Sequence, residues 1–236
     1  MAVRRHMHLY GTTEEQLGWV SVAQREWARL NPLAVFREPM TIDDYLRHPY
    51  IVAPLRRPDL TLISDGGAAV VVTSAERARD CRAAPVHLLA MAQQSAIRNE
   101  QNEDKLMRPW LGDIAGPAVR RGRRHRGRHQ RGVSPGRHLG VGAADAGVVR
   151  LLRPRRGRPF LAEGHTRPGG SLPVNTHGGQ LSESYTHNWM HLYEAVRQLR
   201  GECGDRQLDG PELALHAQTH DFWKGAATLL STRETA

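Results

Sequence analysis

The segment between Arg120 and Arg158 constrains the fold of this chain more than any other feature of the sequence. It holds 13 arginines and a single acidic residue, Asp145. Its apolar residues recur with neither the period of a strand nor that of a helix, and Gly, Arg, His and Pro dominate it. Such a composition is typical of a linker. We therefore expect residues 117–159 to lack regular structure and to separate two ordered parts of the chain.

The same stretch explains the net charge of the chain. A formal charge of +9 is what a nucleic-acid-binding protein would carry. Outside the stretch, however, 20 basic and 23 acidic residues leave the chain slightly acidic. All 13 basic residues inside it are arginines, and no aromatic side chains alternate with them to stack on bases. An RNA-binding function, whose affinity would fall steeply with salt, is the least favoured interpretation, and we expect no nucleic-acid partner.

The length and the cysteine content exclude further classes of protein. A chain of 236 residues that is 39% hydrophobic can bury a substantial core. The longest apolar run, Ala68–Val72, is far shorter than the roughly 20 residues of a membrane-spanning helix, and the N-terminus lacks the apolar stretch of a secretory signal. Cys81 and Cys203 are too few for a disulfide framework and too far apart for a zinc site built from paired cysteines. We expect a cytoplasmic protein without a membrane span or a metal.

Local patterns predict helices and one buried strand in the first part of the chain. Thr12 and Glu15 form a potential capping box for an amphipathic helix over Thr12–Leu30. Thr41 and Asp44 repeat this signal for a short helix, and Tyr45–Arg57 is predicted as a loop.

A Ser-Asp-Gly-Gly turn and a β-branched run follow. The run Val70–Thr73 predicts a buried central strand. Ser74 can then cap a helix over Ala75–Asp80, and Pro85–Met91 predicts another strand.

The last part of the chain predicts one long helix and two strands. After a Gly-rich approach that ends in Thr176-His177-Gly178-Gly179, apolar residues recur at helical spacing until Gly201, which can end the helix. These residues are Leu181, Tyr185, Trp189, Leu192, Val196 and Leu199. Glu212–Gln218, with Leu213, Leu215 and Ala217 pointing inward, and Ala226–Ser231 predict strands. The fold class is α/β.

Several motifs occur along the chain in a fixed order. They are HMHLYGTTEEQL, FREPMTIDDYL, APLRRPDLTLISDGGAAVVVTS, GGSLPVNTHGGQLSESYTH and EAVRQLRGE. Together they resemble the lipid-transfer branch of the thiolase superfamily, which is related to the thiolase part of sterol carrier protein x. The likeness covers about residues 5–80 and 159–231, and collinear motifs are far more specific than one Gly-rich loop.

The resemblance carries implications for fold, substrate and assembly. It implies a layered αβαβα fold of two similar halves, acyl-CoA substrates, and the formation or cleavage of a carbon–carbon bond beside the thioester. Coenzyme A would enter as part of the substrate, with no other cofactor. The intact protein would be a homodimer or a hetero-oligomer.

The resemblance also implies that part of the family fold is missing. Residues 1–80 would be the end of the N-terminal half with a loop region, 81–116 the start of the C-terminal half, and 160–236 the rest of that half. The segment that carries the nucleophilic cysteine in thiolases would precede this chain, and neither Cys81 nor Cys203 lies in that motif. We expect the isolated chain to be poorly soluble and inactive.

A change of reading frame would account for the arginine stretch. One choice of codons for Arg123–Gln130, read one base further along, gives Gly-Asp-Ile-Glu-Val-Ala-Ile, which resembles the family's strand at this place. The same shift over Arg150–Arg158 gives Gly-Phe-Cys-Ala-Arg-Gly-Glu-Gly-Gly, which resembles the family sequence before Pro159 and Phe160. We infer that about 118–158 is an out-of-frame reading of GC-rich DNA, which re-sequencing of the gene would test.

The candidate site lies around Asn175. Chemistry on a thioester enolate needs an acid or base at the α-carbon and donors for the oxyanion. Gly178 and Gly179 allow close backbone approach, and the following helix would offer free N–H groups. By resemblance, His177 is the candidate oxyanion donor or base and Asn175 with both glycines would bind substrate. The alternative is that His177 simply bonds to loop backbone.

Tyr185 stands where ordinary thiolases have the histidine of their Gly-His-Pro motif, ten residues after the asparagine. A phenol is a poor base but a competent proton donor. This departure favours a modified acyl transfer or the retro-aldol cleavage known in steroid-degrading relatives. The alternative is that Tyr185 belongs to the buried side of a helix.

Other residues carry weaker signals. Asp65 could contact the CoA end of the substrate, although a turn-stabilising role is commoner. His187 and His191 have zinc-binding spacing, but Asn188 replaces the glutamate that a metalloprotease needs. His220 stands near the place of the late cysteine motif of thiolases and is predicted in a surface loop. We expect the tryptophans Trp27, Trp189 and Trp223 in the core or an interface.

Three hypotheses follow from the sequence. The first is a thiolase-like acyl-CoA C-acyltransferase of lipid or steroid metabolism. The second is a lipid-transfer protein of the same fold that is non-catalytic or depends on a partner, which activity only in a complex would identify. A retro-aldolase on a steroid or fatty acyl-CoA that needs a partner is the related alternative. The third is the RNA-binding protein, whose affinity would vanish on deletion of residues 120–158.

Overall fold

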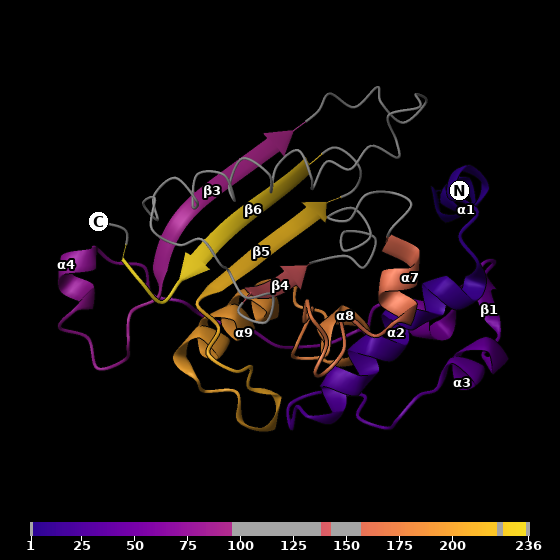
Figure 1. Ribbon diagram of the computed structural model, residues 1–236, viewed down its shortest axis with the longest axis horizontal. Coiled ribbons are helices and arrows are strands. Elements are labelled where there is room, and N and C mark those ends of the chain that lie inside the picture. Colours follow the sequence, from indigo (N-terminus) through magenta and orange to yellow (C-terminus); the bar gives the residue numbers. More distant parts are fainter. Residues whose placement is uncertain (1, 96–137, 143–156, 221–223, 235–236) are drawn as a thin grey trace.

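The computed structural model describes residues 2–95, 138–142, 157–220 and 224–234. Its elements form two groups, a four-stranded sheet covered by one helix and a helical group around a central helix (Figure 1). None of the helices in these ranges is long and apolar enough to cross a membrane.

The sheet contains strands from the middle and from the C-terminal part of the described chain. Its order is β3 (His87–Ser95), β6 (Lys224–Ser231), β5 (Leu213–His220) and β4 (His138–Gly142). The pairs β3–β6 and β6–β5 are antiparallel, whereas β5–β4 is parallel. Helix α9 (Trp189–Arg200) packs on one face, against β4, β5 and β6.

Alternation along β5 divides the sheet core into two faces. Leu213, Leu215 and Ala217 pack in one cluster with residues of β3 and β6, as the sequence predicts. Ala214 points to the opposite face, where it packs against α9. Both faces of β5 therefore contact apolar side chains.

Helix α2 (Glu14–Arg29) is the centre of the second group. It contacts α3 (Ile42–Arg47), α7 (Gly157–Ala162), α8 (Gly179–Ser182) and the 3₁₀ turn η1 (Arg57–Asp59). Helix α8 joins this group to the sheet group (Figure 1), because the chain continues from it into α9. The remaining elements are α1 (Ala2–Tyr10), the pair β1 (Tyr50–Val52) and β2 (Leu55–Arg56), α4 (Ala75–Ala78) and η5 (Gly204–Arg206).

The predicted helix starts are confirmed, with one shift. Asp44 N donates to Thr41 Oγ1 over 3.1 Å, and Thr41 N donates to Asp44 Oδ2 over 2.9 Å, which makes the predicted capping box. At α2, however, the box forms between Thr13 and Gln16, one residue later than predicted. Two overlapping Thr-x-x-Glu/Gln patterns occur there, so the sequence did not decide between them.

The run Val70–Thr73 does not form the predicted buried strand. It belongs to no strand, and the side chains of Val71 and Val72 are 93% and 85% exposed. A strand needs a neighbour for its backbone donors and acceptors, and none of the described segments pairs with this run. The predicted loop 45–57 also differs, because it holds the end of α3 and the pair β1–β2.

The predicted elements that flank this run are present. Ser74 caps α4, which ends at Ala78 instead of Asp80. Strand β3 covers the predicted Pro85–Met91 in part and extends to Ser95.

The single long helix predicted after Gly179 is two helices. Helix α8 ends at Ser182 and α9 begins at Trp189, with Gly201 at its C-terminus as predicted. His187 and Asn188 adopt left-handed backbone angles, with φ of 47° and 72°, which no right-handed helix can contain. The apolar spacing continues through the break because Tyr185 and Trp189 happen to stand in phase with the helix.

The predicted structureless segment 117–159 is in part ordered. Residues His138–Gly142 form β4, and α7 begins at Gly157. Parallel pairing with β5 supplies backbone partners that no local pattern indicates. The other residues of the segment, and with them most of the inferred out-of-frame region, lie outside the described residues.

Candidate functional site

The turn before α8 is built from left-handed residues. Asn175, Gly178 and Gly179 have φ of 54°, 110° and 60°. A Cβ atom at Gly178 would lie 2.6 Å from Ala28 Cβ, and one at Gly179 would lie 2.1 Å from Gln24 Oε1. The two glycines thus allow the turn to pack closely on helix α2, and their predicted approach to a substrate stays a prediction.

Buried amide side chains fix the position of this turn. Asn31 Nδ2 donates to the backbone oxygen of His177 over 2.8 Å, and Leu181 N donates to Gln24 Oε1 over 3.1 Å. Asn175 and Thr176 are buried as well. The turn is therefore attached to α2 by hydrogen bonds as well as by close packing.

His177 points into the interior. It is 2% exposed, and its ring meets that of His191 edge-on, with centroids 4.5 Å apart. Neither ring nitrogen of His177 has a hydrogen-bond partner among the described residues, so the alternative of a bond to loop backbone is not seen. Burial, with smaller effects of Glu194 in the opposite sense and of Arg206, lowers the pKa of His177 to about 4. The ring is thus neutral near pH 7 and holds one unused N–H.

A buried ion pair lies close enough to His177 to affect its pKa. Arg206 of η5 binds Glu194 of α9 through two nitrogens, with Nε–Oε1 and Nη2–Oε2 distances of 3.0 Å. Thr176 Oγ1 donates to Glu194 over 2.8 Å, and Gln198 Nε2 donates to the same carboxylate over 3.1 Å. Burial alone would raise the pKa of Glu194, but His177, Arg206 and Thr176 hold it below its ordinary value.

Sequence reasoning missed this cluster. His191, Glu194 and Gln198 lie three and four residues apart and are all buried in α9, which places polar groups on the face that packs inward. The spacing of these polar residues on one side of the helix is the sequence signal that could have revealed the cluster. The partner Arg206 is supplied by a separate turn, which the local pattern of α9 does not reveal.

Tyr185 lies outside this interior, in the loop between α8 and α9. It is half-buried, its backbone N donates to Ser64 Oγ over 3.2 Å, and its hydroxyl lies 3.4 Å from Nδ1 of the exposed His187. A Cβ atom at Gly66 would lie 3.3 Å from Thr186 Cγ2. The fold therefore brings the Ser-Asp-Gly-Gly turn, in which Asp65 is exposed, beside the loop of Tyr185.

The two candidate catalytic residues are not in contact with each other. No hydrogen bond or ring contact within the described structure joins His177 to Tyr185, because the first packs beneath the turn and the second lies on the loop beyond α8.

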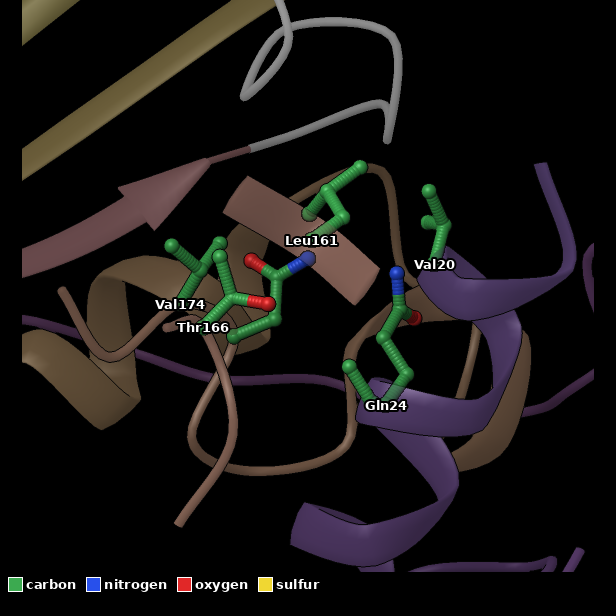
Figure 2. A pocket seen from close by; sticks show the side chains of 7 residues that line it. Val20, Gln24, Leu161, Thr166 and Val174 are labelled. Carbon is green, nitrogen blue, oxygen red and sulfur yellow. The ribbon is translucent and has the colours of Figure 1, made fainter. Parts of the chain in front are cut away.

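A small pocket lies behind the turn (Figure 2). Its volume of about 20 Å³ suffices for roughly one water molecule, so it cannot hold an acyl-CoA. Thr166 Oγ1, which lines it, is buried without a partner in the described chain. The other lining residues are Val20, Ala23, Gln24, Leu161, Val174 and Asn175.

The remaining candidates have varied positions. His187 is exposed while His191 is buried, so they share no site, and no cluster of three metal-binding side chains occurs within the described ranges. His220 is the last residue of β5 instead of part of a loop, because pairing with Lys224 extends the strand. Cys81 is exposed, whereas burial raises the pKa of Cys203 to about 12.

The tryptophans differ from one another. Trp27 is buried, and its Nε1 donates to the Thr166 backbone oxygen over 2.8 Å, as expected for a core residue. Trp189 is 51% exposed, so it lies outside the core, and its place in an interface stays a prediction. It begins α9 directly after the left-handed Asn188, and the loop directs it outward. Trp223 lies outside the described residues.

Comparisons with known proteins show which family the chain resembles in sequence and fold. A family model described as "Thiolase C-terminal domain-like" matches residues 144–233. The chain is 37% identical over 214 residues to the 17-hydroxy-3-oxo-4-pregnene-20-carboxyl-CoA lyase of Mycobacterium tuberculosis, covering 85% of this chain and 54% of the lyase. It is 33% identical over 241 residues to an acetyl-CoA acetyltransferase of Methanothermobacter thermautotrophicus, covering 94% and 58%.

A solved structure also matches the whole chain. It is described as an Ltp2-ChsH2(DUF35) aldolase, and the matched chain superimposes with a TM-score of 0.80 at 29% identity. The match covers 100% of this chain and 63% of the other. The present chain thus spans a little more than half the length of the relatives it matches.

Proposed function

Because this chain belongs to the thiolase superfamily, in the branch that its motifs predict, we propose that it acts in a retro-aldol cleavage of a steroid or fatty acyl-CoA. Its thiolase-like α/β fold supports this assignment. The relatives named above include a lyase and an aldolase, and for that reason we favour the lyase reaction over the acyl transfer that the motifs alone would suggest.

The reaction conserves atoms and charge without a further cofactor. The substrate is an acyl-CoA with a hydroxyl on its β-carbon. A base removes the hydroxyl proton, the bond between the α- and β-carbons breaks, and its electron pair forms the thioester enolate. The β-carbon becomes a ketone or aldehyde. A proton donor then supplies one proton to the α-carbon and leaves a shortened acyl-CoA.

The position of Tyr185 is the observation that carries the proposal. By the resemblance, Tyr185 stands in the place of the thiolase histidine, and a phenol donates a proton more readily than it removes one. Its hydroxyl is within 3.4 Å of an imidazole nitrogen at the surface, beside the turn that holds Asp65. We assign to Tyr185 the delivery of the proton to the α-carbon, and to Asp65 a contact with the CoA portion.

His177 would serve as the oxyanion donor. Its neutral ring has an N–H that no described residue uses, and a neutral imidazole can stabilise an enolate oxygen. Since the ring is buried, this role requires the turn Asn175–Gly179 to open when substrate binds. His177→Asn keeps an N–H donor and should retain more activity than His177→Leu.

We also propose a partner subunit. The name of the matched aldolase joins Ltp2 to ChsH2(DUF35), and the present chain covers 63% of the aldolase chain. A protein of the DUF35 type is therefore the candidate for a hetero-oligomer with this chain.

The test compares two tyrosine variants. The chain is purified with and without a DUF35-type partner and is given a tertiary β-hydroxy steroid acyl-CoA, and ketone and shortened thioester are measured. Tyr185→Phe should lower kcat about 100-fold or more, the ordinary contribution of a proton donor. Tyr193→Phe, a half-buried tyrosine on α9, should leave kcat unchanged. Equal activity of Tyr185→Phe and the unaltered chain would refute the proposal.

An acyl transfer remains the second candidate, since an acetyltransferase is 33% identical. Thiolysis consumes free CoA and yields two thioesters, whereas the retro-aldol reaction yields one thioester and a carbonyl compound. The same assay with and without free CoA separates the two.

A further inference from the structure

The loop between α8 and α9 holds an imidazole beside the proposed proton donor. His187 Nδ1 lies 3.4 Å from the hydroxyl of Tyr185. The ring centroids are 4.8 Å apart and the ring planes are inclined by 48°. Because His187 is exposed and Tyr185 half-buried, a substrate can reach the pair from solvent.

The backbone under this imidazole is strained. His187 and its neighbour Asn188 have φ of 47° and 72°, in a region that costs a non-glycine residue about 1–2 kcal/mol. Such strain persists where the surroundings enforce it, and it is frequent at functional sites. Here the left-handed backbone returns the His187 ring toward a residue only two positions earlier.

Side chains from other elements enforce the strained conformation. Asn188 Nδ2 donates to Gln218 Oε1 of β5 over 2.9 Å, and Gln180 of α8 donates to Asn188 Oδ1. On the other side of the loop, the Tyr185 backbone is bonded to Ser64 Oγ. The backbone of Tyr185 and the residue after His187 are therefore both held by hydrogen bonds to other elements.

We propose that His187 is a positioning residue, whose Nδ1 accepts the hydrogen bond of the Tyr185 hydroxyl and holds that hydroxyl in one orientation for proton delivery. This requires the neutral imidazole with its proton on Nε2. The delivery of a proton by the Tyr185 hydroxyl rests on the proposed function. The contact between Tyr185 and His187 does not depend on it. His187 need not touch the substrate in this role.

Two variants separate the acceptor from the backbone conformation. His187→Gly removes the ring and relieves the strain, so the variant should fold at least as stably as the unaltered chain. His187→Asn tolerates left-handed angles and places an oxygen acceptor near the position of Nδ1. His8→Asn, an exposed residue of α1, is the control.

The readout is the ¹³C resonance of the tyrosine Cζ atom, with Tyr185 assigned by its loss in Tyr185→Phe. We expect His187→Gly to shift the Tyr185 resonance, His187→Asn to restore part of the shift, and His8→Asn to have no effect. In the aldolase assay with partner, His187→Gly should lower kcat by about tenfold at unchanged KM, and His187→Asn should recover part of it.

The two proposals fail in different ways. An identical Tyr185 resonance in His187→Gly and the unaltered chain would overturn the positioning role. A shifted resonance in a chain whose complexes never cleave the thioester would support the pair and contradict the proposed function.

Discussion

At the residue scale, three buried histidines make stability depend on pH. Burial lowers the pKa values of His177 and His216 to about 4 and that of His191 well below its ordinary value. In the unfolded chain these rings accept a proton near pH 6.5. The unfolded state therefore binds more protons between about pH 6.5 and 4, and stability falls as the pH falls through that window.

This pH dependence can be measured by urea unfolding at intervals between pH 7.5 and 4.5. The two pKa shifts to about 4 correspond to about 3 kcal/mol for each of His177 and His216 when fully developed. His216→Asn should flatten the dependence, while the exposed His8→Asn should leave it as it is. If the pH dependence of the unfolding free energy is unchanged in His216→Asn, this ring takes up its proton at the same pH in the folded and the unfolded chain, which would contradict the prediction.

The buried ion pair of Glu194 and Arg206 gives a second prediction at the residue scale. Glu194→Gln leaves Arg206 buried without its countercharge, and such a loss costs about 3–5 kcal/mol. The exposed pair of Arg79 with Glu234 is the matched control, and Glu234→Gln should have no measurable effect because water screens that pair. Urea unfolding of both variants checks this. A small loss in Glu194→Gln would mean that water reaches the buried cluster.

At the element scale, the docking of the turn against α2 depends on Gly178. Alanine there combines a φ of 110° with a Cβ atom 2.6 Å from Ala28 Cβ. Gly201 is the matched control, because its φ of 75° carries the same kind of strain but no atom lies within 4 Å of an added Cβ. Gly201→Ala should cost about 1 kcal/mol and Gly178→Ala about 3 kcal/mol or more. Thermal unfolding measures both, and equal losses would show that α2 does not press on the turn.

Local signals predicted most of the elements but not every boundary. The caps at Thr41 and Ser74 depend on side-chain hydrogen bonds within a few residues, and the stop at Gly201 depends on the left-handed backbone that glycine adopts readily. A sequence displays both signals directly. The break before α9 depends instead on Asn188 and its bond to Gln218 of a distant strand. No window of local sequence contains that contact, and the in-phase tyrosine concealed the break.

The same distinction applies to the candidate site. The family motif identified Asn175, His177 and Tyr185 from their order in the sequence. Their environments could not be read from it, because the burial of His177 depends on α9 and the neighbour of Tyr185 is Ser64, 121 positions away. The pair of Glu194 and Arg206 joins α9 to η5, and no sequence pattern connects these two elements.

At the scale of the whole molecule, the distribution of backbone hydrogen bonds determines which segments expose their amides to water most readily. Strand β6 is paired on both sides, with β3 and with β5, so its amides exchange only when the sheet opens as a unit. The run Ala68–Thr73 has no described backbone partner, although its sequence is that of a core strand.

Amide hydrogen exchange followed by mass spectrometry compares these two segments within one sample. Peptides from β6 should retain hydrogen longest, whereas those from Ala68–Thr73 should exchange within seconds because their N–H groups face water. Peptides from Ile42–Arg47 are an intermediate reference, since α3 is short but capped at Thr41. Protection of Val70–Thr73 equal to that of β6 would mean that the run pairs as a strand in solution. The sequence-based prediction would then be right and the exposed conformation of Val71 and Val72 wrong.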